Sequence, residues 1–269
     1  MREAAFYREA FDRESAALSS LTGADYSAPV PSCPGWTVGI LLAHLTGIYA
    51  RVRFLARNRV REETAISFEM LELPADFGVL YEAARSGAPA YPTPPQLPAL
   101  QALFTDTAAE MAAALWNLDP AEELWNSFAA EPKAGFWQRR MALETAVHRW
   151  DAQLALGVPK PIEPGLAVEG IEETYDVLLA HRRRRTPAVL IGRGETYHLH
   201  RTDGPGEWLV EFLPEQPVVR REHAKGDIAL RGSASDLLLW LWQRMPADQL
   251  EVFGDATLIE HYFRLVPPN

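Results

Sequence analysis

The sequence predicts an α-helical bundle over residues 1–185, followed by a small α+β domain over residues 186–269. Two observations favour this fold class. Apolar residues recur at helical spacing through the first two thirds of the chain, whereas short runs of β-branched and aromatic residues alternate with glycine-rich turns after residue 186. The length of 269 residues suits one large domain or two modest ones. The change of pattern therefore indicates helices packed on helices, with a mixed sheet in a second unit.

The helical part begins with a segment whose apolar residues share one face: Phe6, Ala10, Phe11, Leu18 and Leu21. Thr37 follows a turn-rich break at 29–35, and its hydroxyl can cap a second helix. Further helices are expected at 77–85, 97–118, 135–156 and 165–185. The proline-rich run 88–95 must be a loop. Gly157 is expected to end the helix at 135–156.

The C-terminal part has the pattern of strands separated by turns, one of them at Gly204-Pro205-Gly206. Strands are expected at 187–192, 196–200, 207–212, 218–223, 227–231 and 250–255. Ser233 or Ser235 can cap an apolar helix over 236–244, and a last helix should run through Leu265.

Charge and cysteine content exclude several classes of protein. The net charge is −10 and the sequence pI is about 5.2, so nucleic acid and anionic membranes are not expected partners. Cys33 is the only cysteine, which excludes an intramolecular disulfide. The charged N-terminus has no apolar signal core, and the apolar run 237–242 is far shorter than the roughly 20 residues that span a bilayer. We therefore expect a cytoplasmic protein with a reduced thiol.

Three polar side chains recur on one face of the helix expected at 135–156. Glu144 and His148 are four residues apart, about 40° around the helix axis, and Asp151 returns to the same side. Two carboxylates and an imidazole are costly to bury unless a cation neutralises them. The spacing also resembles the Glu and His ligand pairs of metal-binding helical bundles.

A third ligand has to come from another helix, and His44 is the candidate because its neighbours are apolar. Three N and O ligands leave a fourth position open, as in catalytic zinc sites, although nickel, iron or manganese accept the same donors. Asp151 could then orient a ligand imidazole or a bound water. The ordinary explanations remain open at this point: a satisfied core histidine for His44, and a surface ion pair for Glu144 and His148.

Other polar features have plain structural interpretations. Cys33 is expected to belong to the turn before the His44 helix, because no base adjoins it in sequence. The four arginines 182–185 are expected to be a solvated helix end. His198 and His200 share one face of a strand, but no third ligand stands near them in sequence, so we expect an exposed pair. Trp36 and Trp150 flank the proposed ligands and could shield the metal from water.

Two blocks of sequence resemble the signatures of the mycothiol-dependent maleylpyruvate isomerase family. They are 33–45, CPGWTVGILLAHL, and 144–152, ETAVHRWDA. The stretches 230–242 and 251–255 resemble the smaller C-terminal domain of that family. The family belongs to the DinB-like superfamily of metal-binding four-helix bundles, and the resemblance covers most of the chain in the expected order.

The resemblance implies that His44, Glu144 and His148 hold a divalent metal, in this family usually Zn²⁺. It also implies a low-molecular-weight thiol, mycothiol or a related one, that adds to a small electrophilic substrate. The chain would then be a cis–trans isomerase or a thiol transferase, working as a monomer or weak homodimer. Arg231 or Arg244 could bind a substrate carboxylate. The alternative is a non-catalytic metal-binding protein that regulates or holds a ligand on the same scaffold.

Overall fold

The computed structural model describes residues 2–21, 24–86, 96–128, 130–185 and 191–266. They form two compact units, 1–160 and 161–269. The division falls between residues 160 and 161, whereas the sequence predicts a boundary near 186. The physical reason is that the helix after Pro161 packs against a helix of the sheet domain, so contacts group it with the sheet. The proline-rich segment 88–95 lies outside the described residues.

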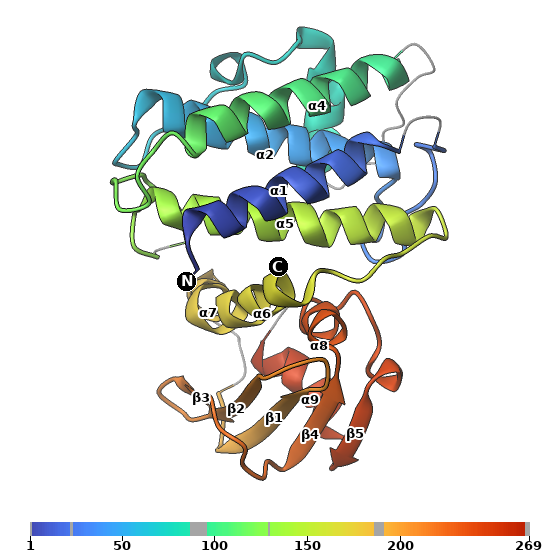
Figure 1. Ribbon diagram of the computed structural model, residues 1–269, viewed down its shortest axis with the longest axis vertical. Helices are drawn as coiled ribbons and strands as arrows, with labels where there is room; N and C mark the ends of the chain where they lie inside the picture. Colours follow the sequence, from blue (N-terminus) through green and yellow to red (C-terminus); the bar gives the residue numbers. More distant parts are fainter. Residues whose placement is uncertain (1, 22–23, 87–95, 129, 186–190, 267–269) are drawn as a thin grey trace. The chain divides into compact units, whose positions relative to one another are not determined.

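The first unit is a bundle of four long helices, which Figure 1 shows side by side. They are α1 (Ala4–Ser19), α2 (Val38–Asn58), α4 (Gln96–Leu115) and α5 (Ala134–Ala155). A shorter helix, α3 (Gly78–Ser86), contacts α2, and single 3-10 turns occur at η1 (Glu69–Leu71) and η2 (Ala75–Phe77). The helices expected in this part of the chain are therefore present, with ends shifted by a few residues.

Aromatic side chains fill the centre of the bundle. The ring of Tyr49 lies between those of Phe11 and Phe104, with centroid distances of 5.5 and 5.8 Å. All three side chains are fully buried. They join α1, α2 and α4, and burial of such large apolar surfaces is the main stabilising contribution in a core of this kind.

Helix α2 begins where the sequence predicts. The hydroxyl of Thr37 accepts a hydrogen bond from the backbone N–H of Ile40, which confirms Thr37 as the N-cap. Its composition and its length of 21 residues would allow it to cross a membrane, but 78% of that apolar window is buried inside the structure. The core helix of a bundle has this pattern as well, so α2 is weak evidence for a membrane span.

Helix α5 is the most enclosed element of the bundle. Every residue from 134 to 153 is buried, including several charged ones. Gly157 follows it with φ of +74°, a left-handed conformation that glycine adopts without strain, and this confirms the predicted helix end. Polar side chains on α5 therefore have to find their partners inside the protein.

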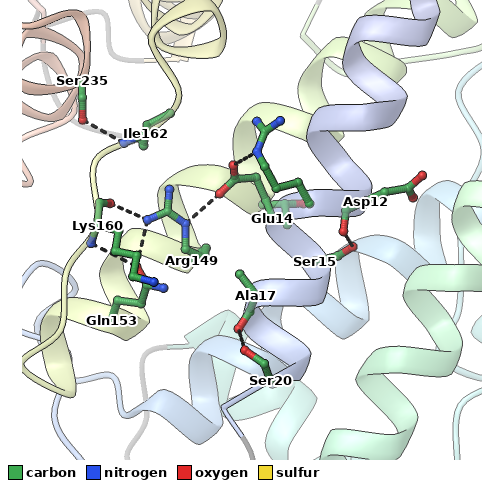
Figure 2. Close-up of polar contacts among 12 residues, drawn as sticks. Asp12, Glu14, Ser15, Ala17, Ser20, Arg149, Gln153, Lys160, Ile162 and Ser235 are labelled. Atoms are coloured by element: carbon green, nitrogen blue, oxygen red, sulfur yellow. Dashed lines mark hydrogen bonds and ion pairs between the residues drawn. The ribbon is translucent and has the colours of Figure 1, made fainter.

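A buried ion pair joins α5 to α1, as Figure 2 shows. Nε of Arg149 donates to Oε2 of Glu14 at 2.7 Å. The same guanidinium donates to the side chain of Gln153 at 2.9 Å and to the carbonyl of Lys160. These contacts fix the polypeptide just after α5 against the bundle.

The second unit contains a five-stranded mixed sheet with strand order β3-β2-β1-β4-β5. Its strands are β1 (Glu195–Arg201), β2 (Glu207–Phe212), β3 (Pro217–Arg220), β4 (Ile228–Gly232) and β5 (Glu251–Gly254). β1 and β4 pair in parallel, and the other neighbours are antiparallel. Five of the six expected strands are present. In the sixth, expected at 187–192, residues 187–190 lie outside the described residues, and 191–192 form no strand.

Helices cover one face of this sheet. They include α8 (Ala234–Leu241), which contacts β1 and β4, and α9 (Leu258–Leu265), whose Tyr262 ring packs on Tyr197 at 5.1 Å. Of the two proposed caps of α8, Ser233 is the actual one, since its hydroxyl accepts from the N–H of Asp236. Because side chains alternate along a strand, His198 and His200 lie on the face opposite Tyr197.

The helix expected at 165–185 is divided in three. α6 (Pro164–Glu173) leads into a π-helical turn, η3 (Thr174–Leu178), and then α7 (Leu179–Arg185). A 3-10 turn, η4 (Ala247–Gln249), precedes β5. The expectation that the arginines of α7 are all solvated is wrong for Arg182, which is buried.

Candidate metal centre

Helices α2 and α5 bring together the three side chains singled out from the sequence. Oε1 of Glu144 lies 3.3 Å from Nε2 of His44 and 3.3 Å from Nε2 of His148. The two imidazole rings meet edge to face, with centroids 5.1 Å apart. One donor atom from each residue lies within 4.8 Å of the others, so two nitrogens and one oxygen converge on a common point. This is a donor set that borderline divalent metals accept.

Helical spacing explains how α5 supplies two of these groups. Glu144 and His148 are one turn apart and lie on the same side of the helix, facing α2. His44 lies on α2 between apolar neighbours, and its side chain is 25% exposed while that of His148 is 6% exposed. The cluster is therefore embedded in the bundle but reachable from the His44 side.

Asp151 fixes the orientation of His148. Its Oδ2 lies 2.9 Å from Nδ1 of His148, and its Oδ1 accepts a hydrogen bond from the hydroxyl of Ser32 at 2.6 Å. An Nδ1–H that donates to the carboxylate directs Nε2, which would become a metal ligand on release of its proton, toward Glu144 and His44. A carboxylate behind a histidine is the usual support of a metal-binding imidazole.

Cys33 lies in the turn before α2, as the sequence predicts, and its Sγ is 3.6 Å from Oδ2 of Asp151. With His148 and Asp151 it forms a second, overlapping group of metal-binding side chains. The half-buried thiol thus adjoins the same imidazole from the other side.

A cation already accompanies the carboxylate ligand. Arg140, one turn before Glu144 on α5, donates to Oε2, and both residues are buried. Burial alone would raise the pKa of Glu144, but the Arg140 guanidinium and the two imidazoles hold this pKa well below its ordinary value. Oε1, on the side of the histidines, is therefore an ionised oxygen donor.

The two histidines differ in their electrostatic surroundings. Burial lowers the pKa of His44, and its hydrogen bond with Glu144 only partly opposes this effect. Burial would also lower the pKa of His148, but hydrogen bonds with Asp151, Cys33 and Glu144 raise it well above its ordinary value. The lone pair of His44 is thus available near neutral pH.

Trp36 covers the two imidazoles, as proposed from the sequence. Its ring centroid lies 4.7 Å from that of His44 and 5.9 Å from that of His148, stacked on the latter. Trp150 is buried on α5. An apolar wall of this kind strengthens electrostatic interactions beside it because it excludes water.

A pocket of about 220 Å³ opens beside His44, between α2 and α3. Its lining includes Arg51 and Arg85, together with Gly47 and Tyr81. Arg51 is seven residues after His44 and so lies two turns away on the same side of α2. These lining residues were not expected from the sequence, although the spacing of Arg51 from His44 was a signal that could have identified it.

Two interpretations from the sequence concern the second unit. Arg231 pairs with Glu251 at 3.1 Å, and Arg244 donates to the carbonyl of Trp242 at 2.9 Å.

The interpretation of His198 and His200 as an exposed pair without a third ligand is wrong. His198 is buried, and Glu207 and His223 join both histidines in one cluster. Glu207 comes from β2 and His223 from the connection between β3 and β4, which sequence proximity does not reveal.

Two family models match the chain in succession. The "Mycothiol maleylpyruvate isomerase N-terminal domain" matches residues 7–153, and the "MDMPI C-terminal domain" matches residues 165–261. A search of the curated proteins finds no match.

Two solved structures are similar to the chain. They are the mycothiol-dependent maleylpyruvate isomerase, with a TM-score of 0.62, and a histidine-to-alanine mutant of it, with a TM-score of 0.61. Each is 14% identical, and each match covers 95% of both chains, a likeness that establishes the fold. Because the first family model spans more than half of the sequence and the second follows it in order, the chain belongs to the mycothiol maleylpyruvate isomerase family.

Proposed function

We propose that the protein is a thiol-dependent metalloenzyme that acts on a small, electrophilic, anionic substrate as a cis–trans isomerase or thiol transferase. His44, Glu144 and His148 would hold one divalent ion, Zn²⁺ or a related metal such as Ni²⁺. The observation that carries this proposal is the convergence of two Nε2 atoms on Oε1 of Glu144, each at 3.3 Å. The anchoring of His148 by Asp151 supports it, because the ring is oriented for a ligand on its other side.

The donor set fits a catalytic rather than a structural ion. Three protein ligands leave a coordination position free, and the partial exposure of His44 gives a small molecule access to it. When bound, a divalent ion would lower the pKa of a coordinated thiol and so favour the thiolate, which is the nucleophile. The low-molecular-weight thiol is mycothiol or a relative, which is the thiol in the names of the family and of the similar solved structures.

The pocket beside His44 suits the substrate. Arg51 and Arg85 line it and can bind carboxylate groups, while Tyr81 and Gly47 limit its width. Such binding would hold the substrate's double bond or leaving group near the thiol. The walls formed by Trp36 and Tyr81 would limit access of water during the reaction.

We further expect the protein to act in the cytoplasm with small molecules, not nucleic acid or membranes, as its partners. A monomer or weak homodimer is sufficient for the site, because all three proposed ligands come from one chain.

The test uses metal content and turnover together. The purified protein is analysed for bound metal and is then incubated with mycothiol, bacillithiol or glutathione and with maleate-type and epoxide-type electrophiles. Glu144→Gln and His148→Asn should each lose the bundle metal and thiol-dependent turnover. The matched control is His261→Asn. His261 lies on α9, outside the proposed metal centre, and pairs with Glu195 at 3.1 Å, so this variant should retain both the bundle metal and the turnover.

The outcomes separate the candidate activities. An isomerase returns the thiol unchanged, whereas a transferase consumes one thiol per product. Metal that binds through these ligands without any thiol-dependent turnover would point to the non-catalytic alternative. Full metal retention by both ligand variants would overturn the site assignment.

A further inference from the structure

A second group of metal-binding side chains lies on the face of the sheet opposite Tyr197. It consists of His198 and His200 on β1, Glu207 on β2 and His223 in the connection from β3 to β4. We propose that these four side chains bind a divalent cation of the Zn²⁺ class, separately from the ion in the bundle. We call this group the sheet cluster.

One carboxylate lies at the centre of the sheet cluster. Oε2 of Glu207 is 2.7 Å from Nε2 of His198 and 2.6 Å from Nδ1 of His223. Oε1 is 3.3 Å from Nδ1 of His200. Three imidazoles from separate positions in the chain therefore converge on a single glutamate.

The spacing of the donor atoms is close to that of a tetrahedral site. One ligand atom from each of the four residues lies within 4.8 Å of all the others. Zn–N and Zn–O bonds of about 2.1 Å place ligands roughly 3.4 Å apart in a tetrahedron. The hydrogen-bonded pairs of Glu207 with His198 and His223 are shorter than this, at 2.7 and 2.6 Å. Modest side-chain rotations of Glu207, His200 and His223, which are 23%, 28% and 76% exposed, would bring the donor atoms to this spacing.

Strand pairing explains why these residues meet. His200 and Glu207 are direct partners in the antiparallel β1–β2 pair, so their side chains lie next to each other on one face. His198 is two residues earlier on β1 and shares that face. The chain then passes through β3 and returns His223 to the same face, next to His198 at a ring-centroid distance of 5.3 Å.

The chemistry of the donor set selects the metal class. Three imidazole nitrogens and one carboxylate oxygen suit Zn²⁺, Ni²⁺ or Cu²⁺ and disfavour Mg²⁺ and Ca²⁺, which prefer oxygen ligands. Four protein ligands form a closed tetrahedral set, the pattern of structural zinc sites. An ion here would attach the exposed connection at His223 to the two buried or half-buried histidines of β1.

This inference does not depend on the proposed function. The sheet cluster and the bundle ligands share no residue and lie in different compact units. Either site can therefore be removed while the other is measured.

The experiment counts metal ions on the full chain. The protein is stripped with a chelator, dialysed against buffered Zn²⁺ and analysed for zinc per polypeptide, and a parallel Co²⁺ titration records the visible bands of tetrahedral cobalt. Wild-type protein should bind two equivalents. The sheet variant His200→Asn/His223→Asn and the bundle variant His44→Asn/His148→Asn should each bind one, and His261→Asn should bind two.

A stability measurement separates a site from a purely hydrogen-bonded cluster. Zn²⁺ should raise the melting temperature of the bundle variant, which retains the sheet cluster, and circular dichroism verifies that each variant is folded. A bundle variant that binds no zinc, or a sheet variant that still binds as many ions as wild type, would overturn the proposal. If wild type bound a single zinc ion and the sheet variant bound none, the sheet cluster would be supported and the proposed function would be contradicted.

Discussion

Asp151 and His148 are three residues apart on α5, and Oδ2 of the aspartate lies 2.9 Å from Nδ1 of the histidine. Both side chains are buried, and the hydroxyl of Ser32 donates to the other oxygen of Asp151 at 2.6 Å. The aspartate thereby determines which ring nitrogen of His148 is directed toward Glu144 and His44. Asp151 would not contact the proposed ion, but by orienting His148 it can control how strongly the ion binds.

Replacing Asp151 with asparagine should weaken Zn²⁺ binding in the bundle by about 10–100-fold, because the ring loses a charged partner that orients it and increases its basicity. Competition with a chromophoric chelator measures the affinity, in a protein whose sheet cluster has been removed. Ser32→Ala keeps the carboxylate and removes a single hydrogen bond, so its affinity should change by no more than about threefold. Equal affinity in Asp151→Asn and wild type would show that the aspartate does not support a ligand.

Arg51 offers a test of the pocket beside His44. Arg51→Met should weaken binding of a small dicarboxylate such as maleate by about 10–100-fold, because a charged hydrogen bond contributes about 1.5–3 kcal/mol. Calorimetry on the zinc-loaded protein measures the affinity. Arg57→Met on the same helix is the control, since Arg57 is already paired with Glu72 and Glu110, at 3.2 and 3.1 Å. A similar loss in both variants would indicate a general effect of charge and not a specific site.

Much of this arrangement could be predicted from local sequence. The Thr37 cap, the end of α5 at Gly157 and the shared face of Glu144 and His148 depend on neighbours within a few residues, and helical geometry determines their relation. Apolar neighbours made His44 only a candidate for the third ligand, and the resemblance to the family, not helical spacing, selected it.

The sheet cluster shows why other features could not be predicted. His198 and His200 alternate visibly on one strand, but Glu207 and His223 join them through strand register and a return of the chain. The register of β1 with β2 depends on the geometry of the hairpin turn, and the return of His223 depends on packing of the chain, so the spacing of the two histidines along one strand specifies neither. The same reason applies to the π-helical turn at 174–178, because packing in the second unit, not helix propensity, determines where a long helix is interrupted.

The buried pair of Glu14 and Arg149 should be important for the stability of the bundle (Figure 2). Glu14→Gln keeps the shape of the side chain but leaves the guanidinium without its charged partner, at a cost of about 3 kcal/mol in the free energy of unfolding. Urea unfolding followed by circular dichroism measures this cost. Asp12→Asn makes the same chemical change on α1 but breaks an exposed pair with Arg8, and should cost less than about 0.5 kcal/mol.

If the two variants proved equally stable, the Glu14–Arg149 pair would contribute no more than a surface pair. Gln153 and the carbonyl of Lys160 would then be sufficient partners for the guanidinium.

The carboxylate of Asp203 should make the stability of the second unit depend on pH. Its Oδ1 accepts hydrogen bonds from Nε of Arg201 at 2.6 Å and from the N–H of Ala234, the first residue of α8, at 3.1 Å. Partial burial would raise the pKa of Asp203, but these two donors lower it below its ordinary value of 3.8. The charge also lies at the positive end of the α8 dipole.

Asp203→Asn should therefore lower the free energy of unfolding by about 1 kcal/mol at neutral pH. Because the folded-state pKa is lower than the unfolded one, the stabilisation is complete above pH 3.8 and is lost as the pH falls through the folded-state value. Urea unfolding of both proteins at about pH 7, 5 and 3 measures the difference, which should stay constant between the first two and shrink at the last. Asp248→Asn, at an exposed carboxylate that accepts from Gln249, is the control and should show neither effect. A difference that grew on acidification would mean that the protonated form of Asp203 is the one that the fold prefers.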